Sequence, residues 1–211
     1  MQRSLKVCAT GVFSAAPDLI RASVKLSGVR ETYEKAAEDF KNSFDLLVEA
    51  AGDEFSFKTA DFFINAHYTD ERDRNNAWSK KFEGYMFSHT LCCEFGFDTA
   101  KLGRFVSVLS RCECVDSFGF DYALSDLEKA TDSACAQAVR NATAKAETLA
   151  DAAGVGLGEI VSVDFRASAR NVGAARMYKM NDRAAVMSAS LEISPSDLTI
   201  AETVEIAWEL I

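Results

Sequence analysis

The feature that most constrains this fold is a row of small side chains at helical spacing. Apolar positions recur at steps of three and four, at Leu127, Ala130, Ala134, Ala138, Ala142, Ala146, Leu149 and Ala153. This period predicts one helix of about 28 residues, roughly 42 Å long. Ser125 and Glu128 have the S-x-x-E spacing of a capping box and predict its first turn. Because alanine is small and favours helices, we expect this helix to lie close against a sheet.

Three glycines follow this helix, at Gly154, Gly156 and Gly158. A phosphate-binding glycine run comes after a strand and opens a helix, where free N–H groups and the helix dipole attract an anion. Here the glycines close a helix, where the dipole repels phosphate. We therefore interpret Gly154 as a left-handed cap at the end of the helix.

Strands are predicted where apolar and polar residues alternate, or where β-branched and aromatic residues are frequent. They cover residues 4–14, 19–29, 55–69, 81–95, 115–124, 158–165 and 198–211. The turn at residues 16–18 contains a Pro–Asp pair and predicts that the first two strands form a hairpin.

Two more apolar stripes at helical spacing predict helices, over residues 32–51 and from Asp98 to about residue 109. Gly52 is expected to end the first helix, and Asp98 to cap the second. The resulting order is ββα-ββα-βα-ββ. It predicts an α+β fold, a mostly antiparallel sheet with helices packed on one face, in one domain spanning residues 1–211.

The overall charge limits the partners of the chain. The 211 residues carry a net charge of −9. An acidic chain repels phosphate backbones, so nucleic-acid binding is not expected. No apolar run reaches the roughly 20 residues that span a bilayer. The start of the chain lacks the pattern of a signal peptide. It therefore predicts a cytoplasmic protein as written, or a periplasmic or exported one if a leader has been removed.

Residues 166–190 depart from the regular patterns. They contain five cationic residues and one acidic residue, a net charge of +4 in an acidic chain. One interpretation is a contact arm that docks on an acidic surface of a neighbouring subunit. The other is a solvated loop. The contact residues in the first interpretation are Arg170, Arg176, Met177, Lys179, Met180 and Arg183.

The six cysteines are expected to be reduced and structural, because a chain of this length can bury a core without disulfides. Cys112 and Cys114 could join a zinc site only with ligands from elsewhere in the chain. His89 and Cys93 share a strand face but lie about 13 Å apart along it, too far to bind one metal directly. We expect no metal.

No catalytic motif stands out, and no G-x-S-x-G nucleophile elbow occurs. Spacing leaves open a nucleophile pair such as Cys92 with His67, since such partners meet in space. No local signature supports that pair. The sequence therefore predicts a protein that is not an enzyme and has no cofactor.

Several segments in their order resemble the SIMPL domain family. The hallmarks are the G-x5-PD turn with its following strand, the Gly84–Tyr85 pair, and the A-x-x-KAE-x-LA-x-x-x-G helix. The similar segments are residues 9–29, 82–95, 98–109, 115–163 and 198–211, which together span nearly the whole chain.

The resemblance implies an α+β fold, no known cofactor, no established active site and a tendency to form oligomers. Bacterial members are often linked to the envelope or to stress tolerance. On this basis we expect a non-enzymatic, homo-oligomeric scaffold or envelope and stress-related factor. The alternative is a small-molecule or peptide binder with a pocket between sheet and helices. The ligand remains unknown.

Overall fold

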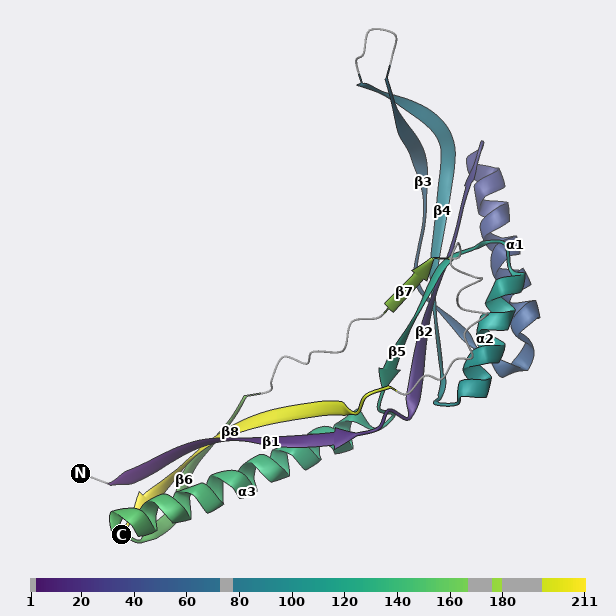
Figure 1. Cartoon of the computed structure of the whole chain (residues 1–211). Coiled ribbons are helices and arrows are strands. Elements are labelled where there is room, and N and C mark those ends of the chain that lie inside the picture. The colour runs from purple at the N-terminus through teal and green to yellow at the C-terminus, as the bar shows by residue number, and fades with distance from the viewer. Residues whose placement is uncertain (1–2, 73–77, 167–175, 180–194) are drawn as a thin grey trace. The chain divides into compact units, whose positions relative to one another are not determined.

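The computed structural model describes residues 3–72, 78–166, 176–179 and 195–211 (Figure 1). The chain divides into two compact units. The first contains residues 1–17, 124–172 and 195–211, and the second contains residues 18–123 and 173–194. Each unit has an antiparallel sheet with helical cover on one face, so the predicted α+β class is confirmed. The described strands form two separate sheets, one of three strands and one of five.

The first unit is a three-stranded sheet covered by one long helix. Its strands are β1 (Ser4–Ala15), β8 (Leu198–Leu210) and β6 (Leu157–Arg166), in the spatial order β1-β8-β6. In the helix α3 (Leu127–Ala153) the predicted row is buried from Ala130 to Ala146, but the predicted Leu149 and Ala153 are exposed and Ala150 is buried in their place. The buried row is Ala130, Ala134, Ala138, Ala142, Ala146 and Ala150.

Gly11 shows how closely α3 lies on β1. A Cβ atom built on Gly11 would come within 2.1 Å of the carbonyl oxygen of Ala134 and 2.2 Å of the amide nitrogen of Ala138. On the neighbouring residue, the Thr10 carbonyl accepts a 2.8 Å hydrogen bond from Nδ2 of Asn141. A glycine in the strand and alanines in the helix therefore bring the two backbones together.

The ends of α3 confirm one prediction and correct another. Gly154 has φ +69° and forms the predicted left-handed cap, with its N–H directed to the carbonyls at the end of the helix. The predicted capping box is wrong. The N-cap is Asp126, whose carboxylate accepts a 2.9 Å hydrogen bond from the amide of Lys129. Aspartate and serine are both favoured at this position, and spacing alone selected the wrong residue.

The second unit is a five-stranded antiparallel sheet with the order β3-β4-β2-β5-β7. The bounds of its strands are β3 (Phe57–Arg72), β4 (Trp78–Gly96), β2 (Leu19–Arg30), β5 (Val115–Ala123) and β7 (Arg176–Lys179). The short strand β7 and the 3-10 turn after the first helix are additions to the predicted element order. The strand β7 lies within the segment that we expected to be irregular.

Helices α1 (Tyr33–Ala51) and α2 (Thr99–Arg111) cover one face of this sheet, and the short 3-10 helix η1 (Gly52–Glu54) follows α1 (Figure 1). Asp98 caps α2 as predicted, accepting hydrogen bonds from two amides of its first turn. Aromatic residues fill the core. The ring of Phe105 contacts those of Phe55 and Phe95 at centroid distances of 4.9 and 5.4 Å.

The predicted hairpin between the first two strands is wrong. β1 pairs with β8, whereas β2 lies between β4 and β5. The backbone of Asp18 is bonded within the second unit, with its N–H donating to Ala123 and its carbonyl accepting from Phe97. Alternation identifies a strand and its wet face, but it does not encode which strand lies beside it.

Replacing Gly11 with alanine tests the contact between β1 and α3. The added methyl group meets backbone atoms that cannot turn aside, so we expect the free energy of unfolding to fall by about 1–3 kcal/mol. Gly103→Ala in α2 is the matched control, because a Cβ atom there meets nothing within 4 Å. It should raise stability by about 0.5–1 kcal/mol. Equal denaturation midpoints for the two variants would contradict the close packing.

Candidate functional site

The β3–β4 hairpin extends beyond the rest of its sheet (Figure 1). β2 pairs with β4 only as far as the Arg30–Tyr85 pair. β4 continues to Trp78, and in this part its partner among the described residues is β3 alone. We call residues 68–72 and 78–84, the two-stranded end of this hairpin, the arm.

One face of the arm carries a row of aromatic rings. The row begins where Tyr33 of α1 meets Tyr85, at a centroid distance of 5.9 Å. It continues from Tyr85 to Phe82 and from Phe82 to Tyr68, each at 5.5 Å. Large parts of these rings are open to solvent, since Tyr68 is 52% and Phe82 46% exposed. Burial by the fold therefore does not account for the row.

A bulge keeps the aromatic row on one face. The register between the two strands shifts between His67 and Tyr68, next to Gly84, which has φ +135°. A Cβ atom on Gly84 would lie 2.3 Å from the carbonyl oxygen of Arg30, at the end of β2. The glycine thus allows the strand to pass the end of β2 and to realign its side chains. This explains the Gly84–Tyr85 pair.

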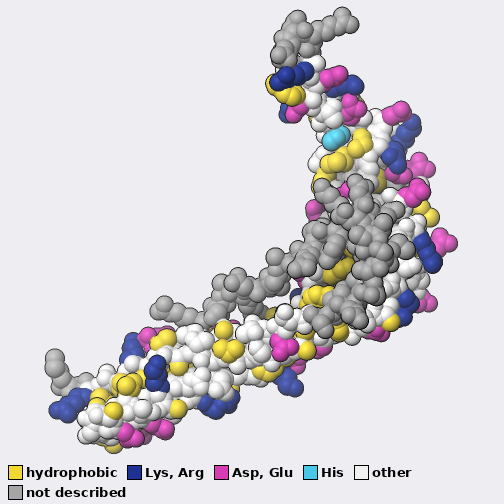
Figure 2. Space-filling view, viewed as in Figure 1, with side chains coloured by type: hydrophobic (Ala, Val, Ile, Leu, Met, Phe, Trp, Pro, Cys, Tyr) yellow, Lys and Arg dark blue, Asp and Glu magenta, His cyan; other side chains and the backbone are white. Residues whose placement is uncertain are grey.

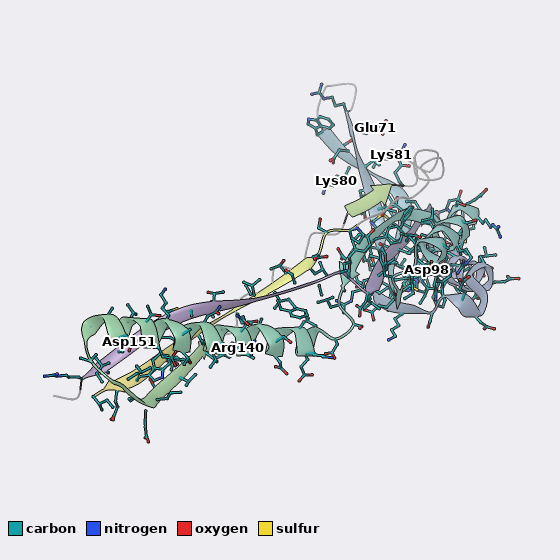
Figure 3. The ribbon with its side chains drawn as sticks, turned by 60° about the horizontal axis from the view of Figure 1, so that its bottom comes forward. Glu71, Lys80, Lys81, Asp98, Arg140 and Asp151 are labelled. Atoms are coloured by element: carbon teal, nitrogen blue, oxygen red, sulfur yellow. The ribbon has the colours of Figure 1, made fainter. Side chains whose placement is uncertain are left out.

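Farther out, the arm is charged. Asp70 lies opposite Lys80, and the guanidinium group of Arg72 lies 4.8 Å above the ring of Trp78. On the other face, Nζ of Lys81 lies 3.2 Å from Glu83 and 4.0 Å from Glu71. The hydrogen bond to Glu83 and the charges of both carboxylates raise the pKa of Lys81. Glu71, Lys80 and Lys81 all project from the arm (Figure 3), where basic and acidic side chains are interspersed (Figure 2).

A cavity of about 720 Å³ opens beside α1, at the end of β2 and the turn that follows α2. Arg30 and Asp39 form an ion pair of 2.6 Å at its wall. The thiol of Cys114 donates to the carbonyl of Ser43 across 3.7 Å, and burial raises the pKa of this thiol. The lining residues are Ser27, Gly28, Arg30, Asp39, Ser43, Leu46, Glu49, Ala50, Arg111, Cys112, Glu113 and Cys114.

The proposed pair of Cys92 and His67 is not brought together. Cys92 lies opposite Lys58 and His67 opposite Gly84, so eight residues of β4, roughly 27 Å, separate the two positions. All six cysteines are free thiols, and Cys8 and Cys92 are exposed. Within the described part of the chain, no group of three or more His, Cys, Asp or Glu side chains could hold a metal ion.

The other glycines after α3 serve the contact with the end of β8. The N–H of Gly156 donates to the carbonyl of Ile211 over 2.6 Å, and the N–H of Ile211 returns a 2.9 Å bond. A Cβ atom on Gly156 would lie 2.7 Å from the Ile211 side chain. This amide is already bonded, so the glycine cluster has a structural explanation.

The predicted contact residues of the basic segment fall into two groups. Arg176, Met177 and Lys179 lie in β7, whose backbone pairs with β5. Arg170, Met180 and Arg183 lie outside the described residues. The contact-arm interpretation of residues 166–190 therefore stays a prediction.

The arm was not predicted from the sequence. However, Gly84, at the bulge where the arm begins, belongs to the Gly84–Tyr85 pair on which the family resemblance partly rests. The sequence profile of SIMPL, a family of unknown function (DUF541), matches residues 5–208. The chain belongs to the SIMPL family. The match includes described strands and helices of both compact units. The family assignment confirms the resemblance seen in the sequence.

Two named relatives of this SIMPL protein are called 26 kDa periplasmic immunogenic protein. They come from Brucella melitensis biotype 1 (strain 16M) and Brucella abortus (strain S19). Each is 26% identical to the chain over 163 residues, which is 75% of this chain and 65% of the relative. The chain thus spans just under two thirds of the length of the relatives it matches. None of the helices described here is long and apolar enough to cross a membrane.

His89 is a buried histidine of the second unit, and its surroundings predict its protonation state. It is 2% exposed and lies against the rings of Phe40 and Phe44. Its Nε2 lies 2.9 Å from the hydroxyl of Thr59, and its Nδ1 has no hydrogen-bond partner. Burial lowers its pKa below the ordinary imidazole value of 6.5. We therefore expect a neutral imidazole in the folded protein at neutral pH.

This state makes stability depend on pH. As the pH falls through about 6.5, the unfolded chain binds a proton before the folded chain does, so stability should fall by up to about 1.4 kcal/mol per pH unit. The loss continues until the lowered folded pKa is reached. Urea unfolding between pH 7.5 and 5 measures it. His89→Phe should flatten the slope, and His67→Gln should not. An unchanged slope in His89→Phe would contradict the assignment.

Proposed function

We propose that this SIMPL protein is a non-enzymatic, self-assembling protein of the bacterial envelope. The observation that carries the proposal is the arm. An isolated two-stranded ribbon is marginally stable in water, and this one exposes Tyr68, Phe82 and Trp78 to solvent. Trp78 is the most exposed of the three, at 67%. Large aromatic side chains on one face are typical of protein interfaces. A second copy of the chain would cover them.

The envelope location and the scaffold or stress role are proposed on other grounds. The relatives in Brucella carry the word periplasmic in their names, which supports the exported alternative. The lack of an enzymatic role is supported by the buried thiols, since burial raises the pKa of Cys93 and Cys114 and so disfavours the thiolate that acts as a nucleophile. The basic segment 166–190 is proposed as a second contact between copies.

The arm should decide the mass of the protein in solution. We expect light scattering to give a mass well above the 23.0 kDa of one chain. The variant Phe82→Thr/Trp78→Thr removes apolar contact area but keeps β-propensity, so it should shift the protein toward monomer. Val163→Thr/Phe165→Thr, two comparably exposed apolar residues of β6, is the control and should leave the mass unchanged. A monomeric wild-type chain would refute self-assembly.

The cavity favours one alternative, a small-molecule or peptide binder. Its volume of about 720 Å³ lies in the usual range of ligand pockets, and Arg30, Arg111 and Glu49 bring charges of both signs to its wall. Such a wall suits a zwitterion such as a short peptide.

A thermal-shift series with dipeptides tests the cavity. Binding to the folded chain alone raises the unfolding midpoint, so a ligand at about 100 times its Kd should add about 2.7 kcal/mol of stability. Ala50→Trp should fill the opening and abolish the shift, because Ala50 is exposed at the cavity wall. Ala144→Trp, on an exposed part of α3, should bind as the wild type does. An equal shift in Ala50→Trp would exclude this cavity.

A further inference from the structure

The arm has two backbone edges open for pairing. β3 is the outermost strand of its sheet, so its outer edge has no partner strand among the described residues. The outer edge of β4 is open between Trp78 and Gly84, because β2 ends at the residue paired with Tyr85. Rows of unpaired N–H and C=O groups are templates for adding a strand from another chain.

The two edges carry opposite charges. Within the arm, β3 contributes the acidic residues Asp70 and Glu71, and β4 contributes the basic residues Lys80 and Lys81. Successive residues of a strand point to opposite faces, so each strand shows its charge on both faces. Each strand also carries one charge of the other sign, Arg72 on β3 and Glu83 on β4, so the net charge within the arm is −1 on β3 and +1 on β4. Arg72 lies over the Trp78 ring, and Glu83 accepts from Thr69 and pairs with Lys81.

Charged side chains on an edge strand usually prevent pairing with other molecules. Here the net charge of each edge opposes pairing with the same edge of another copy and favours pairing with the other edge. Pairing β3 with β3 of another copy would bring the Asp70–Glu71 segments together, and pairing β4 with β4 would do the same for Lys80–Lys81. Like charges opposite each other destabilise a sheet, whereas opposite charges stabilise it. By net charge, the favoured contact between two copies is β3 of one against β4 of the next.

We propose that copies of this chain join head to tail, with the acidic β3 edge of one arm paired antiparallel to the basic β4 edge of the next. This inference rests on the proposed self-assembly and adds its polarity and its partner surface. With the register of the arm repeated, each Asp70 would lie between its own Lys80 and a neighbour's Lys80. The aromatic row would then continue from copy to copy along one face. Such contacts build rings or filaments, because no two-fold axis relates the two edges.

A charge-swapped arm tests the polarity. The variant Asp70→Lys/Glu71→Lys/Lys80→Asp/Lys81→Glu/Glu83→Lys exchanges the signs of the two strands and keeps opposite charges in the 70–80, 71–81 and 81–83 pairs within the arm. We expect it to assemble to the same mass as the wild type. Mixed with the wild type, however, it should sort away from it, because every mixed head-to-tail contact places like charges together. Native mass spectrometry should find less than about one tenth of the mixed oligomers expected from random exchange.

Other outcomes are also decisive. Free mixing would show that the edge charges do not select the partner, and preferential mixing would show a two-fold contact between like edges. Either overturns head-to-tail pairing while leaving self-assembly intact. A wild-type monomer would instead refute the proposed function itself, and the inference with it.

A milder variant guards against misfolding of the swapped arm. Lys80→Gln/Lys81→Gln removes the attraction without creating repulsion and should weaken assembly about tenfold. Lys41→Gln/Lys145→Gln removes the same charge from exposed positions on α1 and α3 and should have no effect. Equal assembly of these two variants contradicts the proposal.

Discussion

The structure depends on one constraint, that the apolar face of each sheet must be covered by helices. The helices that cover the sheets have a finite length. In the first unit α3 supplies this cover with alanines that let it lie almost on the backbone of β1. In the second unit α1 and α2 supply it through large aromatic side chains such as Phe105. The contrast follows from side-chain size, since alanine permits close approach and phenylalanine fills space. The arm begins where this cover ends.

Period and composition were sufficient to predict the three α-helices and the seven longer strands, but not η1 or β7. The stripe of α3, the cap at Asp98 and the left-handed glycine at Gly154 are local features, and each depends on residues a few positions apart. The pairing of strands is not local. The turn at Pro17 and Asp18 has the composition of a hairpin turn, yet it carries the chain from one compact unit to the other. The information that places β1 beside β8 lies about 190 residues away, in matched apolar faces that only tertiary packing brings together.

The arm could have been anticipated only in part. Its aromatic residues are typical of a buried strand, and nothing in residues 55–69 or 81–95 distinguishes a covered ring from an exposed one. Length is the usable signal. β3 and β4 have 16 and 19 residues, whereas their neighbour β2 has 12. Two paired strands that are longer than the neighbouring strand must extend beyond the sheet as a two-stranded ribbon. The Gly84–Tyr85 pair marks the place, because the bulge lies at the end of β2.

A free sheet edge is a hazard that proteins usually manage by adding charge, and this chain divides its charges by strand. Arg72 on β3 and Glu83 on β4 add one charge of the other sign to each strand, and the arm keeps a net charge of −1 on β3 and +1 on β4. In the proposed assembly, the net acidic charge of β3 and the net basic charge of β4 disfavour pairing of like edges and leave unlike edges complementary. The same side chains also pair across the arm, as Lys81 does with Glu71 at 4.0 Å. One set of charges can therefore stabilise the ribbon in a single copy and guide the next copy to its edge. This dual use is the physical reason why the proposed function is assigned to the arm, rather than to the glycine cluster or the thiols.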